Sequence, residues 1–216
     1  MVKNLGLQNS LLSNIIAEIR DEIIQQDSMR FRKNLEKTGE IFAYEVSKEL
    51  RYKNVEVQTP LGIANASVFD DTVLLATILR AGLPLHQGLL NFFDRAENAF
   101  ISAYRKYEKD GSFDIKVEYI SCPSTDDKVI IISDPMLATG TSMVLACKAL
   151  LEKGKPRHIH IVTTIACTEG IDCVEKNLPY NNVTIWTGAV DEELTVKSYI
   201  VPGLGDAGDL AFGKKE

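Results

Sequence analysis

One segment of the chain combines an acid, a glycine and hydroxyl side chains in an order that suits sugar-phosphate binding. Residues 134–142 read Asp-Pro-Met-Leu-Ala-Thr-Gly-Thr-Ser and follow the apolar run 129–133. This order predicts an acid at the tip of a strand and a turn that opens a helix. The free N–H groups and partial positive charge of a helix start suit a phosphate, and Gly140 lets the backbone approach the anion closely. The carboxylate of Asp134 could accept hydrogen bonds from ribose hydroxyls.

The same segment has a simpler interpretation, in which Thr139, Thr141 and Ser142 only cap a helix and Asp-Pro forms a common turn. A Walker-type phosphate loop is excluded, because no Gly-Lys-Ser or Gly-Lys-Thr follows the glycine. From the residues alone, the phosphate site and the helix cap stay open as alternatives.

Two arginines stand at the ends of predicted strands. Arg80 follows the apolar run 72–79 and precedes Ala-Gly-Leu-Pro, and Arg105 follows the run 99–104. The forked donors of a guanidinium group suit phosphate oxygens. Each arginine taken alone could also be a solvated surface side chain.

A glycine-rich segment near the C-terminus is the fourth candidate. Residues 199–209 read Tyr-Ile-Val-Pro-Gly-Leu-Gly-Asp-Ala-Gly-Asp, with three glycines, one proline and two acids. Backbone N–H and C=O groups of such a loop could hydrogen-bond to the edge of a flat heterocycle. The alternative is a turn-rich cap on the sheet. The residues expected to anchor the segment are Tyr199, Ile200, Val201, Leu204 and Phe212.

Other reactive side chains indicate packing rather than catalysis. The four cysteines form no Cys-x-x-Cys pair and are expected to be reduced packing residues. No Ser–His or Cys–His pairing is apparent. His158 and His160 are two residues apart in a predicted strand, so they share a face, and packing explains them better than a metal site.

A predicted parallel sheet would position these loops. Five short apolar runs lack polar alternation, which is typical of strands buried on both faces. Helical segments separate them, so we expect an α/β fold with ligands outside the carboxyl ends of the strands. The predicted strands are 72–79, 99–104, 129–133, 159–165 and 183–187, and the helices are 84–93, 142–152 and 169–177.

The N-terminal part adds helices and a hairpin. The spacing of apolar residues predicts helices over 11–24, capped by Ser10, and over 28–50, with a soft spot at Gly39. Residues 55–58 and 63–68 flank turn residues and predict a short antiparallel pair.

Composition narrows the class of protein. The chain has 216 residues, 45% of them hydrophobic and 25% charged, with a net charge of −6. These values favour one globular domain over residues 1–216 and exclude disordered and coiled-coil classes. A negative balance argues against non-specific nucleic-acid binding. No apolar run approaches the roughly 20 residues of a membrane span, and no secretory signal begins the chain, so we expect no membrane association and a cytoplasmic protein.

Taken together, the four loops resemble the uracil phosphoribosyltransferases of the type I phosphoribosyltransferase class. The resemblance covers nearly the whole chain. It is carried by the predicted helix at 26–45, by Ile-Leu-Arg-Ala-Gly-Leu at 78–83, by Tyr-Arg at 104–105, and by residues 134–142 and 199–213. It implies a mostly parallel central sheet flanked by helices, with N-terminal helices and a projecting β-hairpin. It also implies conversion of uracil and 5-phosphoribosyl 1-pyrophosphate (PRPP) to UMP and pyrophosphate, with Mg²⁺ as cofactor.

The resemblance assigns roles residue by residue. Asp134, Arg105 and Asp206 would be catalytic, and Mg²⁺ would be held mainly by PRPP, with Asp206 facing it. The uracil site would comprise Ile200, Gly205, Asp206 and Ala207. The PRPP site would comprise Arg80, Arg105, Asp134, Pro135, Met136, Leu137, Ala138, Thr139, Gly140, Thr141, Ser142 and Asp206.

The chain departs from the family pattern at a few positions. Thr77 stands where proline is common, Leu210 where Arg or Lys often follows the Gly-Asp pair, and Lys214 where Thr is frequent. Residues 106–124, which would form the hairpin over the site, are divergent. Leu210 removes a positive charge near the expected pyrimidine or metal region, but the core motifs are intact, so we expect catalysis to be retained.

Further expectations follow from the resemblance. A homodimer or higher homo-oligomer is implied, with the N-terminal helices as contributors, and GTP is a candidate effector. Transfer to a different nucleobase is the alternative within enzymes. A PRPP-sensing regulator is the alternative outside enzymes, and it would need a basic surface or a helix-turn-helix that this sequence does not supply.

Overall fold

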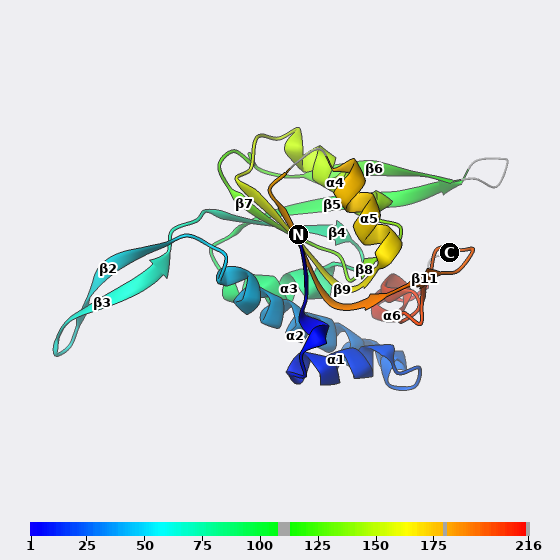
Figure 1. The fold of residues 1–216 in the computed structure, drawn as a ribbon, viewed down its shortest axis with the longest axis horizontal. Helices are drawn as coiled ribbons and strands as arrows, with labels where there is room; N and C mark the ends of the chain where they lie inside the picture. Colours follow the sequence, from blue (N-terminus) through cyan, green and yellow to red (C-terminus); the bar gives the residue numbers. More distant parts are fainter. Residues whose placement is uncertain (108–112, 179–180, 215–216) are drawn as a thin grey trace.

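A mixed sheet forms the centre of the molecule (Figure 1). The computed structural model describes residues 1–107, 113–178 and 181–214, and the side chains of these residues outside 103–118. The strand order is β1-β10-β9-β7-β4-β5-β6, and neighbours run parallel except β5 and β6, which confirms the predicted α/β class. The strands are β1 (Val2–Asn4), β4 (Val73–Leu79), β5 (Glu97–Tyr107), β6 (Phe113–Ser121), β7 (Val129–Ser133), β9 (His158–Cys167) and β10 (Val183–Asp191).

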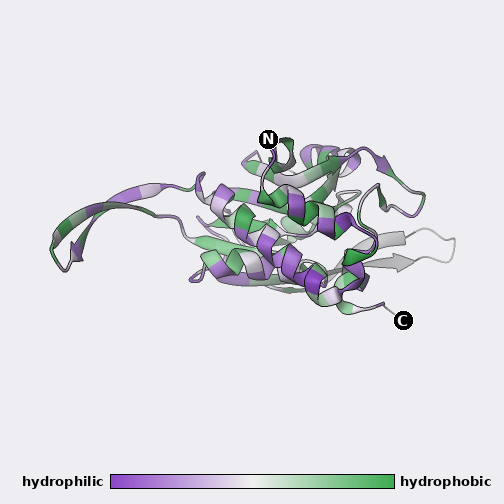
Figure 2. Cartoon of the chain, turned by 90° about the horizontal axis from the view of Figure 1, so that it is seen from below, coloured by the Kyte–Doolittle hydropathy of each residue, from purple (hydrophilic) through white to green (hydrophobic). Residues whose placement is uncertain are grey.

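Helices cover both faces of this sheet. α4 (Thr141–Leu151) and α5 (Thr168–Asn177) pack on one face through buried aliphatic residues. α2 (Ser28–Ser47) and α3 (Leu83–Phe92) pack on the other. Figure 2 shows hydrophilic residues along the outer surface of the helices on this side. Every residue of β7 is buried, which explains why its sequence lacks polar alternation.

A third apolar cluster joins the two ends of the chain. α1 (Leu11–Arg20) and α2 pack through Ile19 and Phe31 against β12 (Ile200–Val201) and α6 (Ala207–Phe212). The N-terminal helices therefore support the C-terminal segment that carries the predicted base-binding loop.

The predicted helix over 11–24 is wrong at its end. Ser10 caps α1 as expected, but the helix stops at Arg20. The carboxylate of Asp21 accepts hydrogen bonds from the N–H groups of Ile23 and Ile24, both at 2.9 Å. This local arrangement competes with the helical hydrogen-bond ladder. The chain turns there through a short 3-10 helix, η2 (Ile24–Gln26).

The predicted soft spot at Gly39 is also wrong, because α2 runs unbroken to Ser47. A Cβ atom at Gly39 would lie 2.2 Å from the carbonyl oxygen of Leu85, and one at Gly88 would lie 1.9 Å from that of Glu36. The two glycines thus let the backbones of α2 and α3 come into direct contact. Gly39 is a packing requirement of the helix pair.

Two antiparallel hairpins extend from the body of the molecule in opposite directions (Figure 1). β2 (Tyr52–Thr59) pairs with β3 (Gly62–Phe69), so the predicted pair is confirmed and is longer than expected. β5 pairs with β6, which confirms an antiparallel hairpin in the divergent segment 106–124. Residues 108–112 of that prediction lie outside the described residues.

The reactive side chains outside the loops serve packing, as predicted. All four cysteines are free thiols, and burial raises the pKa of the Cys147 thiol to about 12. The rings of His158 and His160 lie 4.4 Å apart, and Nδ1 of His160 accepts a hydrogen bond from the Trp186 indole at 3.1 Å. Among the described residues, no helix has both the length and the apolar character to cross a membrane.

The contact between α2 and α3 predicts an unusual effect of Gly88→Ala. A glycine-to-alanine change inside a helix ordinarily favours the helix by about 1 kcal/mol. Here the added methyl group overlaps the α2 backbone, so we expect the free energy of unfolding to fall by about 2 kcal/mol or more. Urea denaturation measures this change. Gln87→Ala, at the exposed neighbouring position, is the control, and equal stability of the two variants would contradict the packing role.

Candidate active site

A pocket with a volume of about 180 Å³ lies at the carboxyl ends of β4 and β7. Its walls come from Ala81 after β4, from residues 134–143 after β7, and from residues 198–208 near the C-terminus. Loops that are far apart in the sequence therefore meet at one edge of the sheet, where open α/β folds bind ligands. Predicted contact residues that line the pocket are Asp134, Met136, Leu137, Ala138, Thr139, Gly140, Ser142, Ile200, Gly205, Asp206 and Ala207.

Backbone hydrogen bonds hold the first loop on the sheet. Directly after β7, the short strand β8 (Met136–Leu137) pairs with β9. The carbonyl oxygen of Pro135 accepts hydrogen bonds from the N–H groups of Thr164 and Ile165, at 3.1 and 3.0 Å. Pro135 thus shapes the loop from behind and is not itself part of the pocket wall.

The start of α4 tests the helix-cap interpretation. Gly140 is the N-cap residue, and no side chain caps the helix. The Thr139 hydroxyl instead donates to the Thr141 hydroxyl at 3.3 Å. Gly140 has a φ of 79°, and a Cβ atom there would lie 2.6 Å from the carbonyl oxygen of Gly170. The helix-cap interpretation is therefore wrong, and the first-turn N–H groups are available to an anion.

Asp134 lies directly after β7, and its backbone N–H donates to the carbonyl oxygen of Val162 at 3.1 Å. Its half-buried side chain forms part of the pocket wall. Burial raises the pKa of the Asp134 carboxyl to about 7, against an opposing hydrogen bond from the N–H of Met136. Hydroxyl groups that donate to this carboxylate would favour its charged form.

Arg80 lies beside the pocket without lining it. Its Nη2 is 3.2 Å from the carbonyl oxygen of Gly213 and 3.5 Å from a carboxylate oxygen of Asp209. Its Nε atom is buried and has no hydrogen-bond partner among the described residues. An unpartnered buried donor is costly, so this atom is suited to an incoming phosphate oxygen.

Arg105 is placed only by its backbone. It lies in β5, in register with Ile115 of β6. Its side chain falls outside the described residues, so its catalytic and PRPP-binding roles stay predictions. Thr141, another predicted PRPP contact, is the first residue of α4 and does not line the pocket.

The C-terminal segment forms the opposite wall. Ile200 and Ala207 are buried, and Gly205 is exposed with a φ of 91°. The carboxylate of Asp206 caps α6 by accepting a hydrogen bond from the N–H of Asp209 at 2.9 Å. This hydrogen bond holds the carboxylate at the pocket wall.

The prediction is wrong for three of the five residues that were expected to anchor this segment. Ile200 and Leu204 are buried, but Tyr199, Val201 and Phe212 are each about 40% exposed. Tyr199 instead lines the pocket together with Ser198, and neither was a predicted site residue. The sequence did contain a signal: Tyr199 is an aromatic residue at the start of a loop that could bind a flat heterocycle. Such a ring can stack on a base.

Two departures from the family pattern have structural explanations. The Thr77 hydroxyl is buried and donates to the carbonyl oxygen of Ser133 at 3.2 Å, which ties β4 to β7. Leu210 is half-buried and packs on the apolar cluster around Ile19 and Phe31. The leucine thus adds apolar packing to α6 at this position.

The comparisons with known proteins identify the family. A family model described as uracil phosphoribosyltransferase matches residues 6–214. The chain belongs to this family. It is 56% identical over 214 residues to a uracil phosphoribosyltransferase of Porphyromonas gingivalis, and the match covers 99% of each chain. It is 38% identical over 205 residues to that of Thermococcus gammatolerans, covering 94% of this chain and 89% of the relative.

Solved structures agree on the fold. The AQ2163 protein from Aquifex aeolicus superposes with a TM-score of 0.87 at 30% identity, covering 99% of this chain and 98% of that one. A hypoxanthine phosphoribosyltransferase from Staphylococcus aureus superposes with a TM-score of 0.50 at 12% identity, covering 76% of each chain. The second similarity concerns the fold alone.

The raised pKa of Asp134 predicts that the ligand-free protein becomes less stable as pH rises. The carboxyl ionises near pH 4 when unfolded and near pH 7 when folded, so the folded state binds the proton more tightly. Stability from this group is present at low pH and is lost as pH rises from about 4 to about 7. Asp134→Asn should not show this pH-dependent loss of stability, because asparagine does not ionise.

Thermal melting at pH 5 and pH 8 tests this prediction. We expect the melting temperature of Asp134→Asn relative to the parent to rise by about 3 °C or more between these pH values. Asp126→Asn is the control, because the pKa of Asp126 is lowered by hydrogen bonds and it is ionised throughout this range. A pH-independent difference for Asp134→Asn would contradict the burial argument.

Proposed function

We propose that the chain transfers the 5-phosphoribosyl group of PRPP to uracil, giving UMP and pyrophosphate. The observation that carries the proposal is that the start of α4 and the loop at 199–209 line the same pocket. One wall suits the phosphate of a ribose 5-phosphate, and the other presents backbone groups to a flat base. Family membership supports the same reaction.

The side chains around the pocket suit displacement at the anomeric carbon. A bond forms from N1 of uracil to C1 of the ribose, the bond from C1 to the pyrophosphate oxygen breaks, and the N1 proton passes to water. The helix start at Thr141 holds the 5-phosphate, and Asp134 accepts hydrogen bonds from the ribose hydroxyls. The guanidinium of Arg80 donates to the departing pyrophosphate, where negative charge grows in the transition state.

Mg²⁺ is part of the proposal, held mainly by the oxygens of PRPP. Among the residues that the structure describes, no group of three or more His, Cys, Asp or Glu could hold a metal ion by itself. In the proposed complex the cation would take most of its ligands from phosphates, with Asp206 at the pocket wall as a protein carboxylate. Bound there, Mg²⁺ would neutralise charge on the pyrophosphate.

A parallel assay tests the reaction. The purified chain is given PRPP and Mg²⁺ with uracil, cytosine, hypoxanthine or orotate, and the nucleotide monophosphate is detected. We expect UMP from uracil alone and loss of product when Mg²⁺ is chelated. Product from another base would favour the alternative of transfer to a different nucleobase. No product with any base, despite PRPP binding, would favour the alternative of a PRPP-sensing regulator. Adding GTP tests its predicted role as an effector.

Arg80→Gln tests the leaving-group role. We expect kcat to fall on the order of 10²–10³-fold, as for the loss of one preorganised charge contact. Arg95→Gln is the matched control, because Arg95 is exposed on the loop before β5. Equal activity of the two variants in the uracil assay would contradict a role for Arg80 in the reaction.

We also propose a homo-oligomer in which the β2–β3 hairpin contacts a second copy. Leu61 at its tip is fully exposed, and Ile63 and Phe69 are 67% and 46% exposed. An isolated two-stranded hairpin is marginally stable, and exposed apolar side chains gathered on it indicate an interaction surface. The N-terminal helices stay the other predicted contributor to assembly.

Replacing Leu61 and Ile63 together by Glu tests this contact. We expect the variant to shift to a smaller species in sedimentation velocity while its circular dichroism is unchanged. Val196→Glu, at a fully exposed position on the loop after β11 (Glu193–Leu194), is the control. An unchanged oligomer in the hairpin variant, or a monomeric parent, would contradict the proposal.

We also propose a cytoplasmic location. All four cysteines are free thiols, as is usual in a reducing compartment.

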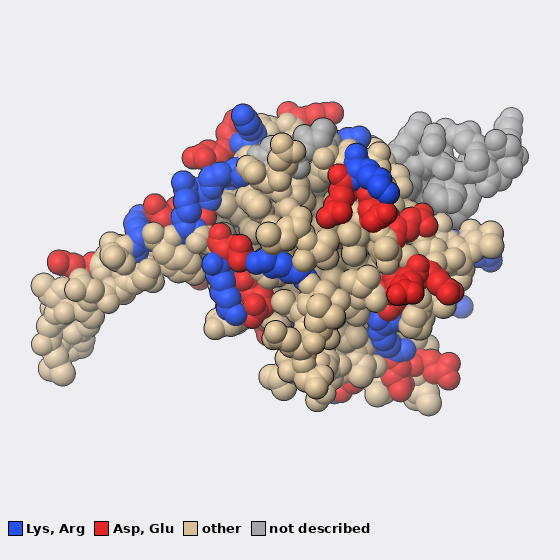
Figure 3. Space-filling model, in the orientation of Figure 1, with Lys and Arg blue, Asp and Glu red and all other residues tan. Residues whose placement is uncertain are grey.

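Acidic and basic side chains are interspersed on the face seen in Figure 3, and the net charge is −6. These features support a small-molecule enzyme with no nucleic-acid partner.

A further inference from the structure

The end of α1 is joined to the end of β10 by a paired ion bridge. Nη1 and Nη2 of Arg20 donate to the two carboxylate oxygens of Asp191, each at 2.8 Å. The Asp191 side chain is 7% exposed and that of Arg20 23%. Burial acts to raise the pKa of Asp191, but hydrogen bonds from Arg20 and from the N–H of Gly203 outweigh it and hold that pKa below its usual value. Neither residue lines the pocket, and neither belongs to a motif that the sequence singled out.

The same two side chains bind both backbone groups of Gly203. Nη1 of Arg20 donates to the Gly203 carbonyl oxygen at 3.0 Å, and the Gly203 N–H donates to Asp191 Oδ2 at 2.9 Å. Gly203 has a φ of 56°, and a Cβ atom there would lie 2.1 Å from the carbonyl oxygen of Ile200. The ion bridge therefore fixes a tight turn that only glycine can make.

This turn lies between the two parts of the proposed uracil site. Ile200 stands before it, and residues 205–207 follow it, and all of these line the pocket. Strand pairing beside this turn is short, because β11 pairs with β12 through two residue pairs. The position of the base-binding backbone groups thus depends on what holds Gly203.

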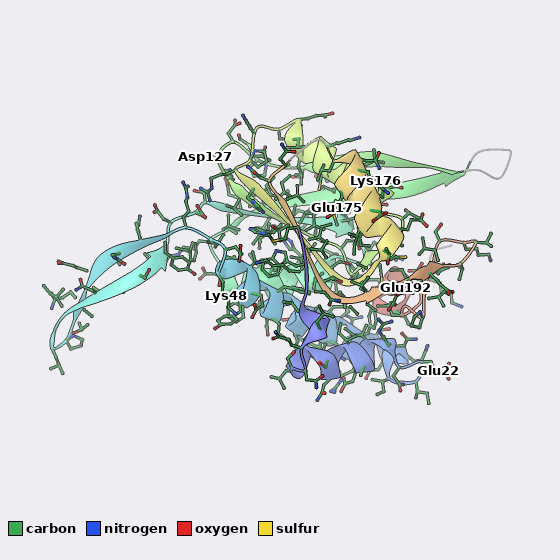
Figure 4. The ribbon with its side chains drawn as sticks, viewed as in Figure 1. Glu22, Lys48, Asp127, Glu175, Lys176 and Glu192 are labelled. Carbon is green, nitrogen blue, oxygen red and sulfur yellow. The ribbon has the colours of Figure 1, made fainter. Side chains whose placement is uncertain are left out.

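The N-terminal segment holds the next residue as well. The side-chain amide of Gln25 lies between the carbonyl oxygens of Ile19 and Leu204 and hydrogen-bonds to both, at 3.0 and 2.8 Å, when its nitrogen faces them. Figure 4 shows Glu22 and Glu192, which neighbour this region in sequence, on the same side of the molecule. The last residue of α1 and the 3-10 helix η2 therefore bind two successive residues of the turn, Gly203 and Leu204.

A purely stabilising role explains this arrangement poorly. Desolvation of a buried ion pair offsets much of its Coulombic attraction, and apolar residues of similar volume often stabilise a fold as well. The pair instead contributes directional hydrogen bonds. Two join Arg20 to Asp191, and two more, to the backbone of Gly203, hold that residue in one conformation.

We propose that Arg20 and Asp191 are positioning residues that hold the turn at Gly203 so that residues 205–207 present their backbone groups to the nucleobase. The inference rests on the proposed transfer to uracil. It adds that uracil affinity is set from the N-terminal helix, through two residues outside the pocket.

Steady-state kinetics of Arg20→Gln, Arg20→Lys and Asp191→Asn test the proposal. For Arg20→Gln and Asp191→Asn we expect KM for uracil to rise about tenfold or more, with KM for PRPP changed by less than about twofold. Arg20→Lys keeps the charge and loses the fork, so its effect should be intermediate. In the double variant Arg20→Gln/Asp191→Asn, KM for uracil should rise little more than in either single variant, because each substitution already breaks the same ion bridge.

Arg30→Gln is the matched control. Arg30 also forms a bidentate pair in the N-terminal helices, with Glu18 at 2.9 and 2.7 Å, and among the described residues none of its side-chain hydrogen bonds reaches the C-terminal turn. Its KM for both substrates should match the parent. Equal changes in both KM values for the Arg20 variants, or an unchanged KM for uracil, would overturn the proposal.

Hydrogen–deuterium exchange gives a readout that does not depend on activity. Amides of residues 200–208 should exchange faster in Arg20→Gln and Arg20→Lys, while those of 134–142 stay as in the parent. If Arg20→Gln fails to fold, Arg20→Lys still decides the question. A parent chain that makes no UMP would count against the proposed function, whereas an active parent with unchanged exchange in the Arg20 variants would count against this inference alone.

Discussion

The strand β7 has β4 on one side, β9 on the other and helices on both faces, so every one of its five residues is buried. A shift in the register of such a strand would draw a charged neighbour, Lys128 or Asp134, into the fully buried segment. The residues after it are therefore fixed in space to the extent that the core is. The phosphate-type loop depends on this constraint, because its acid and its helix start follow the strand without a free linker.

Polar groups without a full set of partners lie in the pocket wall and beside it. The helix start at Gly140 has no side-chain cap, Asp134 is desolvated, and Nε of Arg80 has no partner among the described residues. Each of these states costs free energy in the ligand-free chain. In the proposed reaction, a bound sugar phosphate would offer hydrogen-bond partners to the helix start and to Asp134, so the features that weaken the empty site would favour occupancy.

The two ends of the chain meet on the other side of the pocket. Apolar contacts of Ile19 and Phe31 support the C-terminal segment, and Arg20 and Asp191 direct its turn at Gly203. Apolar packing is non-directional and could hold the segment in several positions. The bidentate bridge adds the direction, which is why the N-terminal helices belong to the function of the site as well as to its stability.

The sequence by itself determined the buried strands, the two specific loops and the family, because apolar periodicity and motif spacing are local properties that do not depend on distant residues. Only the tertiary structure decided that Gly39 is a helix contact, that Tyr199 lines the pocket, and that the pKa of Asp134 is raised to about 7. The pairing of Arg20 with Asp191, which are 171 residues apart, was equally out of reach. Such features arise from burial and from contacts between distant segments, and no spacing along the chain encodes which distant segments will meet.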